Sequence, residues 1–174
     1  GGNLTAFEAM WQDYYRTNTA GLDRYPPLSR DHPYYVIVEG QGADTDADNA
    51  RFTEAVETAL ASGLIVDAVL PKSESERERL WAIREHFNPA PALRPFFSYD
   101  VSLPLRDILV FVDEVRRRLQ LEWSTIRLLV VGHFGDGNLH FIVSPGASGV
   151  GDREALHAAS DRCVYEPLQR YGGA

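Results

Sequence analysis

The sequence contains little cysteine, little methionine and no long apolar run. Its 174 residues include one methionine and one cysteine, Cys163. A single cysteine excludes an internal disulfide framework, so we expect a reducing compartment and a cytoplasmic location. No stretch approaches the roughly 20 apolar residues that cross a bilayer. Any membrane association of the protein is therefore not expected to be encoded in this sequence.

Positive charge is also scarce. Lys and Arg number 17 against 25 Asp and Glu, which gives a net charge of −8. This balance argues against nucleic acid or an anionic membrane surface as the main partner. The one basic run, residues 116–118, is typical of the solvated face of a helix. With 44% hydrophobic residues, the chain is expected to form one globular domain with a substantial core.

Hydrophobic periodicity and turn residues predict helices and strands that largely alternate. Three expected helices begin near Thr5, at Ser73 and after Pro104. Two more are expected over residues 48–62 and 152–171. Glu8 follows Thr5 at capping-box spacing, which supports the first of these helices. The expected strands cover residues 34–39, 64–70, 96–103, 126–133 and 139–144. The last two form a hairpin, so we predict an α+β fold with an antiparallel sheet and helices packed on one face.

The most informative stretch is Gly-His-Phe-Gly-Asp-Gly-Asn-Leu-His at residues 132–140. An Asp-Gly pair between apolar runs favours a two-residue hairpin turn, which would place His133 directly opposite His140. Opposed residues have Cβ atoms roughly 4.5–5.5 Å apart, close enough for two imidazoles to share a divalent metal. The alternative is a hairpin whose histidines make ordinary hydrogen bonds.

Strand alternation gathers polar residues on the sheet face that carries these histidines. That face is expected to hold Ser98, Asp100, Ser102, His133, His140 and Ile142. Asp100, Asp136 and Asn138 are interpreted as structural residues of strand and turn. A polar face of this kind indicates that another molecule or domain packs there.

Three segments in a fixed order carry a resemblance to a known family. They are Leu-Trp-Ala-Ile-Arg-Glu at residues 80–85, Tyr-Asp-Val-Ser-Leu-Pro at 99–104 and the hairpin at 132–140. Together they resemble the C-terminal cap domain of FAD-linked oxidases. This group contains D-lactate dehydrogenases, the glycolate oxidase flavin subunit and D-2-hydroxyglutarate dehydrogenase. The resemblance implies a duplicated, ferredoxin-like cap over residues 1–174 that covers the flavin of a separate FAD-binding domain.

The resemblance also implies roles for individual residues. His133 and His140 match histidines that bind a divalent metal (Zn, Fe or Mn) in the metal-containing members. Arg84 matches an arginine that holds the carboxylate of a small 2-hydroxy acid substrate, a task that suits its planar fork. The alternative for Arg84 is an arginine that contacts the last carbonyls of its own helix. No residue is assigned a catalytic or FAD-binding role.

Two departures from the family pattern concern the substrate. Ser98 stands where the family often has lysine, and Ile142 where it often has asparagine. We count both as substrate-binding positions and expect a preference for D-lactate-like acids over 2-hydroxyglutarate. The FAD-binding domain and a C-terminal Glu-His-Gly segment, which would supply a third metal ligand, are absent, so we expect a fragment that is colourless and inactive alone.

The sequence alone is also compatible with two other functions. One is a metal-free flavin oxidase of the same superfamily that acts on another alcohol, with the histidines contacting substrate or flavin directly. The other is a ferredoxin-like binding module without chemistry, because a fold alone does not imply a function.

Overall fold

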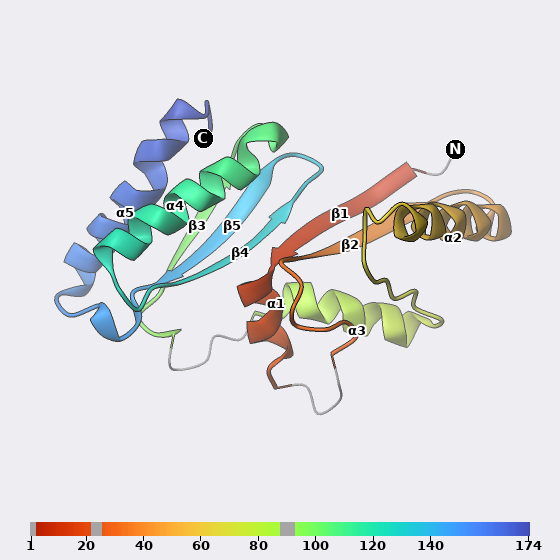
Figure 1. Cartoon of the computed structure of the whole chain (residues 1–174), viewed down its shortest axis with the longest axis horizontal. Coiled ribbons are helices and arrows are strands. Elements are labelled where there is room, and N and C mark those ends of the chain that lie inside the picture. Colours follow the sequence, from red (N-terminus) through yellow and green to blue (C-terminus); the bar gives the residue numbers. More distant parts are fainter. Residues whose placement is uncertain (1–2, 22–25, 88–92) are drawn as a thin grey trace.

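The computed structural model describes residues 3–21, 26–87 and 93–174. Their five strands form one sheet in the order β2-β1-β4-β5-β3, and all neighbouring strands run antiparallel (Figure 1). The strands are β1 (Asn3–Trp11), β2 (Tyr34–Gln41), β3 (Phe97–Ser102), β4 (Arg127–His133) and β5 (Asn138–Ser144). The α-helices are α1 (Gln12–Thr19), α2 (Thr45–Ala61), α3 (Glu74–Glu85), α4 (Ile108–Glu122) and α5 (Arg153–Arg170). The predicted α+β class with an antiparallel sheet is confirmed.

The second half of the chain follows the order β3-α4-β4-β5-α5. Strand β5 lies between β3 and β4, so the crossover through α4 joins two parallel strands with a third inserted between them. This is the split β-α-β arrangement of ferredoxin-like folds.

Helices α4 and α5 cover one face of the sheet, as predicted. The alternation on β3 is confirmed, because Phe97, Tyr99 and Val101 are buried while the residues between them are exposed. Phe141 of β5 and Phe111 of α4 are fully buried and stack with ring centroids 5.8 Å apart. This apolar layer is the main core of the domain.

A second, smaller core lies on the opposite face, where α1 and α3 approach the strands (Figure 1). The sequence prediction did not include this layer. Its buried members are Met10, Tyr14, Tyr15, Tyr35, Ile83, Leu93, Leu129, Val131 and Ile142. The polar face of the sheet is therefore only partly open, and α3 is held directly above it.

The predicted first helix is wrong over residues 5–11. These residues belong to β1, which pairs with β2 on one side and β4 on the other. The apolar spacing of Phe7, Met10 and Trp11 is compatible with a helix and with a strand. Hydrogen bonding to a neighbouring strand on each edge favours the strand. Thr5 does not cap a helix, because its hydroxyl donates to the Glu39 carbonyl. The helix begins only after Trp11.

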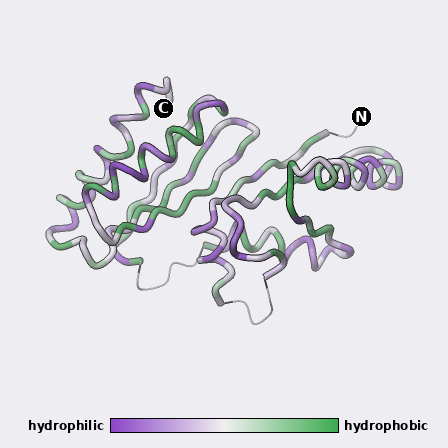
Figure 2. The backbone as a smooth tube through the Cα atoms, in the orientation of Figure 1, coloured by the Kyte–Doolittle hydropathy of each residue, from purple (hydrophilic) through white to green (hydrophobic). Residues whose placement is uncertain are grey.

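The predicted strand at residues 64–70 is also wrong. After α2, Gly63 adopts a φ of +72°, and the amides of Leu64 and Ile65 donate to the Ala59 carbonyl. Those amides therefore complete the helix end instead of joining a sheet ladder. Leu64 and Val66 are 81% and 75% exposed, and this apolar segment is visible after α2 in Figure 2.

The capping signal at Ser73 is confirmed, since its hydroxyl accepts from the Glu76 amide at the start of α3. Within the described ranges, no helix combines the length and the apolar character that a bilayer crossing requires.

Candidate active site on the polar face of the sheet

The hairpin turn between β4 and β5 is longer than predicted. Residues 134–137 form the turn, so His133 lies opposite Asn138 and His140 lies opposite Val131. A type I′ turn needs positive φ at both central residues. Only Gly137 has it (+77°), while the Asp136 carboxylate accepts from the Asn138 amide and stabilises a wider turn. The predicted direct opposition of the two histidines is therefore wrong, because each lies opposite a residue two positions away from the predicted partner.

The two histidines nevertheless share a sheet face. The shift keeps their parity, so His133 and His140 become diagonal neighbours with ring centroids 5.3 Å apart. The predicted geometry of two close rings on one face is confirmed, and their role as metal ligands stays a prediction. Gly132 beside them is required by packing, because a Cβ there would lie 2.5 Å from the Asn138 carbonyl oxygen.

Each histidine presents its Nδ1 atom to a carboxylate. The His133 Nδ1 atom lies 2.6 Å from Oε1 of Glu8, whose side chain is 6% exposed. The His140 Nδ1 atom lies 3.3 Å from Oδ2 of Asp100, whose side chain is 67% exposed. Both rings therefore direct Nε2 away from their carboxylate, which is the arrangement in which proteins commonly present histidine to a metal.

Arg84 reaches this cluster from the last turn of α3. The Tyr14 hydroxyl donates to the Arg84 carbonyl at 2.6 Å, and the side-chain Nδ2 atom of Asn18 donates to the Ile83 carbonyl at 2.8 Å. Burial raises the pKa of Tyr14, so its phenol stays protonated and available as a donor. Side chains of α1 thus satisfy carbonyls at the end of α3, and the Arg84 side chain does not serve that purpose.

The Arg84 guanidinium instead contacts Glu8 and His133. Its Nε atom donates to Glu8 Oε2 at 2.8 Å, and its Nη2 atom lies 2.9 Å from His133 Nε2. Arginine can only donate, so His133 Nε2 accepts and the neutral ring carries its proton on Nδ1. That proton is donated to Glu8. Glu8, Arg84 and His133 therefore form one connected hydrogen-bond network.

The two predicted substrate positions lie on the same sheet face as this network, two same-face residue pairs away from His133. Ser98 is exposed and lies directly opposite Ile142, one pair along the same face from Asp100 and His140. Ile142 is only 7% exposed and packs in the second core. Asn138, opposite His133, has a buried Oδ1 atom with no hydrogen-bond partner among the described residues.

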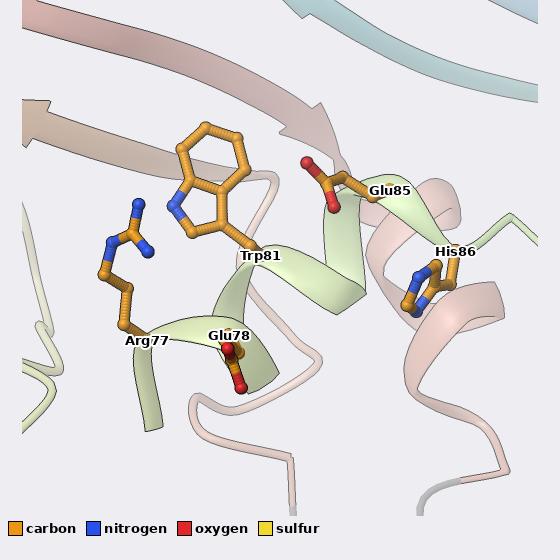
Figure 3. A pocket seen from close by; sticks show the side chains of 5 residues that line it. All are labelled: Arg77, Glu78, Trp81, Glu85 and His86. Atoms are coloured by element: carbon orange, nitrogen blue, oxygen red, sulfur yellow. The ribbon is translucent and has the colours of Figure 1, made fainter. Parts of the chain in front are cut away.

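A shallow pocket lies further along α3. Arg77, Glu78, Trp81, Glu85 and His86 line it, and none of them is a predicted site residue (Figure 3). Beside it, Glu39 of β2 accepts from Arg77 Nε at 2.9 Å and from the Trp81 indole nitrogen at 3.0 Å. The hydrogen bond from Arg77 lowers the pKa of Glu39, and the Trp81 bond acts in the same direction against the opposing effect of burial.

Glu8 is the site residue that the sequence prediction missed. It was interpreted as a helix cap, whereas it lies in β1 opposite His133 and is 5% exposed. The available signal was an acidic residue inside an apolar run of a strand, since a buried carboxylate is rare unless it has a partner.

The site supplies some of the ligand atoms that a divalent metal requires, but not all of them. Two neutral imidazoles with oriented Nε2 atoms are suitable ligands for Zn or Fe. No group of three or more His, Cys, Asp or Glu side chains is placed to hold a metal within residues 3–21, 26–87 and 93–174. His133 Nε2 also faces Arg84, so a metal there requires Nη2 to move away.

Taken together, the ferredoxin-like half, the diagonal histidines and the Arg84 guanidinium define an α+β domain that presents a cationic group beside two imidazoles. Comparison with known families identifies that domain. The chain belongs to the FAD linked oxidases, C-terminal domain family, which it matches over residues 1–174. The resemblance seen in the three sequence segments is thereby confirmed.

Several curated proteins are similar to this chain. A mitochondrial protein of Schizosaccharomyces pombe, named as a putative D-lactate dehydrogenase, is 36% identical over 98% of the chain and 34% of its own length. A D-2-hydroxyglutarate dehydrogenase of Xanthomonas citri pv. viticola is 30% identical over 85% of the chain and 31% of its length. The mitochondrial D-2-hydroxyglutarate dehydrogenase of Rattus norvegicus is 32% identical, over 83% and 26%. The chain thus spans about a third of these relatives or less.

Proposed function

We propose that this chain is the substrate-binding domain of an FAD-dependent dehydrogenase that oxidises a D-2-hydroxy acid. The observation that carries the proposal is the convergence of Arg84, His133 and His140 on one sheet face, in a chain whose family is named for FAD-linked oxidases. An FAD-binding domain of the same polypeptide would be its partner, and the names of the relatives suggest D-lactate or D-2-hydroxyglutarate as substrate classes.

Arg84 is proposed to bind the substrate carboxylate. Its Nε atom donates to Glu8 and its Nη2 atom faces His133, so these two contacts fix the plane of the guanidinium. A carboxylate would then replace His133 as the acceptor for Nη2, in a bidentate contact that orients the substrate. When Nη2 turns to the carboxylate, the His133 Nε2 atom becomes free.

The freed His133 Nε2 atom, together with His140, would lie beside the substrate hydroxyl. A neutral imidazole there accepts the hydroxyl proton, while the Cα–H bond breaks with both electrons so that the acid becomes a 2-oxo acid. FAD, when bound, accepts that hydride. If a divalent metal were bound instead, the Nε2 atoms of His133 and His140 would hold it together with a third ligand from outside the described residues. The metal would polarise the hydroxyl and carboxylate oxygens, and the hydroxyl proton would pass to a base outside the described residues.

An anaerobic flavin-bleaching screen tests the proposal. The flavin-loaded polypeptide that contains this chain is mixed with a panel of D- and L-2-hydroxy acids, and the loss of flavin absorbance is followed. We expect reduction by D acids, with Arg84→Met reducing the rate at low substrate concentration. Reduction by none of the acids, with a flavin that dithionite still bleaches, would contradict the proposal.

A metal-free oxidase of the same superfamily is the second candidate. The contact between Arg84 Nη2 and His133 Nε2 favours it, because the lone pair that would bind a metal already has a donor. Metal analysis of the flavin-loaded protein before and after chelation, with activity measured on both samples, distinguishes the two. The cytoplasmic location stays a prediction, and several relatives are named as mitochondrial.

A further inference from the structure

Glu8 is the least exposed charged group of the candidate site. It lies in β1 opposite His133, at one end of the residue pairs that join β1 to β4, and its side chain is 6% exposed. Both carboxylate oxygens are used: Oε2 accepts from Arg84 Nε and Oε1 contacts His133 Nδ1. One buried carboxylate therefore contacts two residues with proposed roles in substrate binding and oxidation.

The hydrogen bonds of Glu8 determine which nitrogen of His133 carries the proton. With the proton on Nδ1, Glu8 accepts from Nδ1 and the Nε2 lone pair faces Arg84. With the proton on Nε2, an N–H group would face the Arg84 N–H group and a lone pair would face the carboxylate. Both contacts would then be repulsive, so Glu8 and Arg84 select the same tautomer.

We propose that Glu8 is a positioning residue of the active site. It holds His133 as the Nδ1-protonated tautomer, with Nε2 available to substrate or metal, and it orients the Arg84 guanidinium. This inference rests on the proposed function for its effect on turnover, but the tautomer of His133 is independent of it. The equivalent contact on His140 is weaker, because Asp100 is 67% exposed and 3.3 Å away.

Substitution by glutamine separates charge from shape. A glutamine at position 8 offers one oxygen and one NH2 group, while both of its neighbours, Arg84 Nε–H and His133 Nδ1–H, are donors. Only one of them can be satisfied. Glu8→Asp keeps the charge but is shorter by one methylene, so it is expected to restore part of the function.

The matched control is Glu39→Gln. Glu39 also lies on a strand under α3, and it also accepts from an arginine and from a ring N–H group, those of Arg77 and Trp81. It has no contact with either histidine of the site among its described hydrogen bonds. A general loss of stability on removal of a strand carboxylate should therefore appear in both variants, and a positioning effect only in Glu8→Gln.

The first measurement is the ring 15N spectrum of His133 at mildly alkaline pH, assigned with a His133→Asn variant. We expect the Nδ1–H tautomer in the wild-type chain and in Glu39→Gln, and a shift toward Nε2–H in Glu8→Gln. A wild-type ring protonated on Nε2 would overturn the proposal, and this outcome requires no variant to fold.

The second measurement is kcat/KM of the flavin-loaded protein with D-lactate. We expect a decrease of roughly 10- to 100-fold for Glu8→Gln, the usual effect of removing a carboxylate behind an active-site histidine. Glu39→Gln should change it by no more than about fivefold, and Glu8→Asp should fall between them. Equal losses in the two glutamine variants would contradict positioning. If the wild type oxidises no hydroxy acid, the proposed function fails, and the 15N spectrum still decides the role of Glu8 at His133.

Discussion

At the scale of single residues, Ser98 and Ile142 are the two positions that the resemblance predicted to affect substrate choice. They lie opposite each other on β3 and β5, and Ser98 is exposed whereas Ile142 packs in the second core. The buried position explains Ile142 by packing alone. Ser98 is therefore the better candidate for a position that affects substrate choice.

We predict that Ser98→Lys improves the use of D-2-hydroxyglutarate relative to D-lactate. A second carboxylate on the substrate lacks a partner beside Ser98, and an added ammonium would supply one. A partly exposed pair contributes up to about 1 kcal/mol, so the ratio of kcat/KM values should shift by roughly fivefold. Ser62→Lys, at an exposed position that ends α2 and is not part of the sheet, is the control. An equal shift in both variants would indicate a general charge effect.

At the scale of elements, the site depends on how α1 holds the end of α3. The Tyr14 hydroxyl donates to the Arg84 carbonyl, and Tyr14 is 2% exposed. Tyr14→Phe keeps the ring but leaves that carbonyl without this donor. We expect a loss of about 1 kcal/mol in the free energy of unfolding, the usual effect of one such hydrogen bond. Urea denaturation of Tyr14→Phe and of Tyr165→Phe, whose side chain is 44% exposed, tests this. Equal stability of the two variants would refute the anchoring role.

The contact between β2 and α3 should make stability depend on pH. The pKa of Glu39 is lowered from its ordinary value of 4.5, mainly by the hydrogen bond from Arg77. A lowered pKa in the folded state stabilises the protein fully above the unfolded value, and this stabilisation is lost as pH falls through the folded value. The free energy of unfolding of Glu39→Gln should therefore be lower than that of the wild type at neutral pH. The two values should become similar below about pH 4.

The control for that experiment is Glu78→Gln. Glu78 is exposed on α3 and points away from Trp81 in Figure 3. We expect its stability to follow the wild type across the same pH range. A constant difference between wild type and Glu39→Gln from neutral to acidic pH would show that the Glu39 contact does not titrate in this way.

Much of the fold was predictable because its elements have strong local signals. The alternation of β3 and the cap at Ser73 depend on neighbouring residues only, and both were predicted correctly. The structure of residues 5–11 depends on distant strands, whereas that of residues 64–70 depends on the end of α2 just before them. The first segment has two pairing partners and becomes β1, whereas the amides at the start of the second complete the end of α2. Periodicity in the sequence does not contain that information.

The candidate site was predicted to a similar extent. The shared sheet face of His133 and His140 was predicted correctly, and it survives the error in the turn because the register differs from the predicted one by two residues. Glu8 was missed because its partners, Arg84 and His133, are 76 and 125 residues away. An acidic residue within an apolar stretch can be recognised in a sequence, but the partner of Glu8 across the sheet follows only from the pairing of β1 with β4.

At the scale of the whole molecule, the domain presents groups suited to binding a substrate. Residues 1–174 match the C-terminal domain of the family, and the relatives are about three times as long or longer. Arg84 and the histidines can orient a substrate, but oxidation of a hydroxy acid also requires an acceptor for two electrons. We infer that substrate orientation and electron transfer belong to separate domains, and that their interface includes the polar sheet face.

This inference predicts that the 174-residue chain, produced alone, is folded but colourless. The described residues contain their own buried cores on both sheet faces, so folding should not require flavin. We expect cooperative thermal unfolding, no flavin absorbance after purification in excess FAD, and no oxidation of D-lactate. A longer polypeptide that joins this chain to its flavin-binding domain should bind FAD stoichiometrically and bleach with substrate. Stoichiometric flavin in the 174-residue chain would overturn the division of roles between the domains.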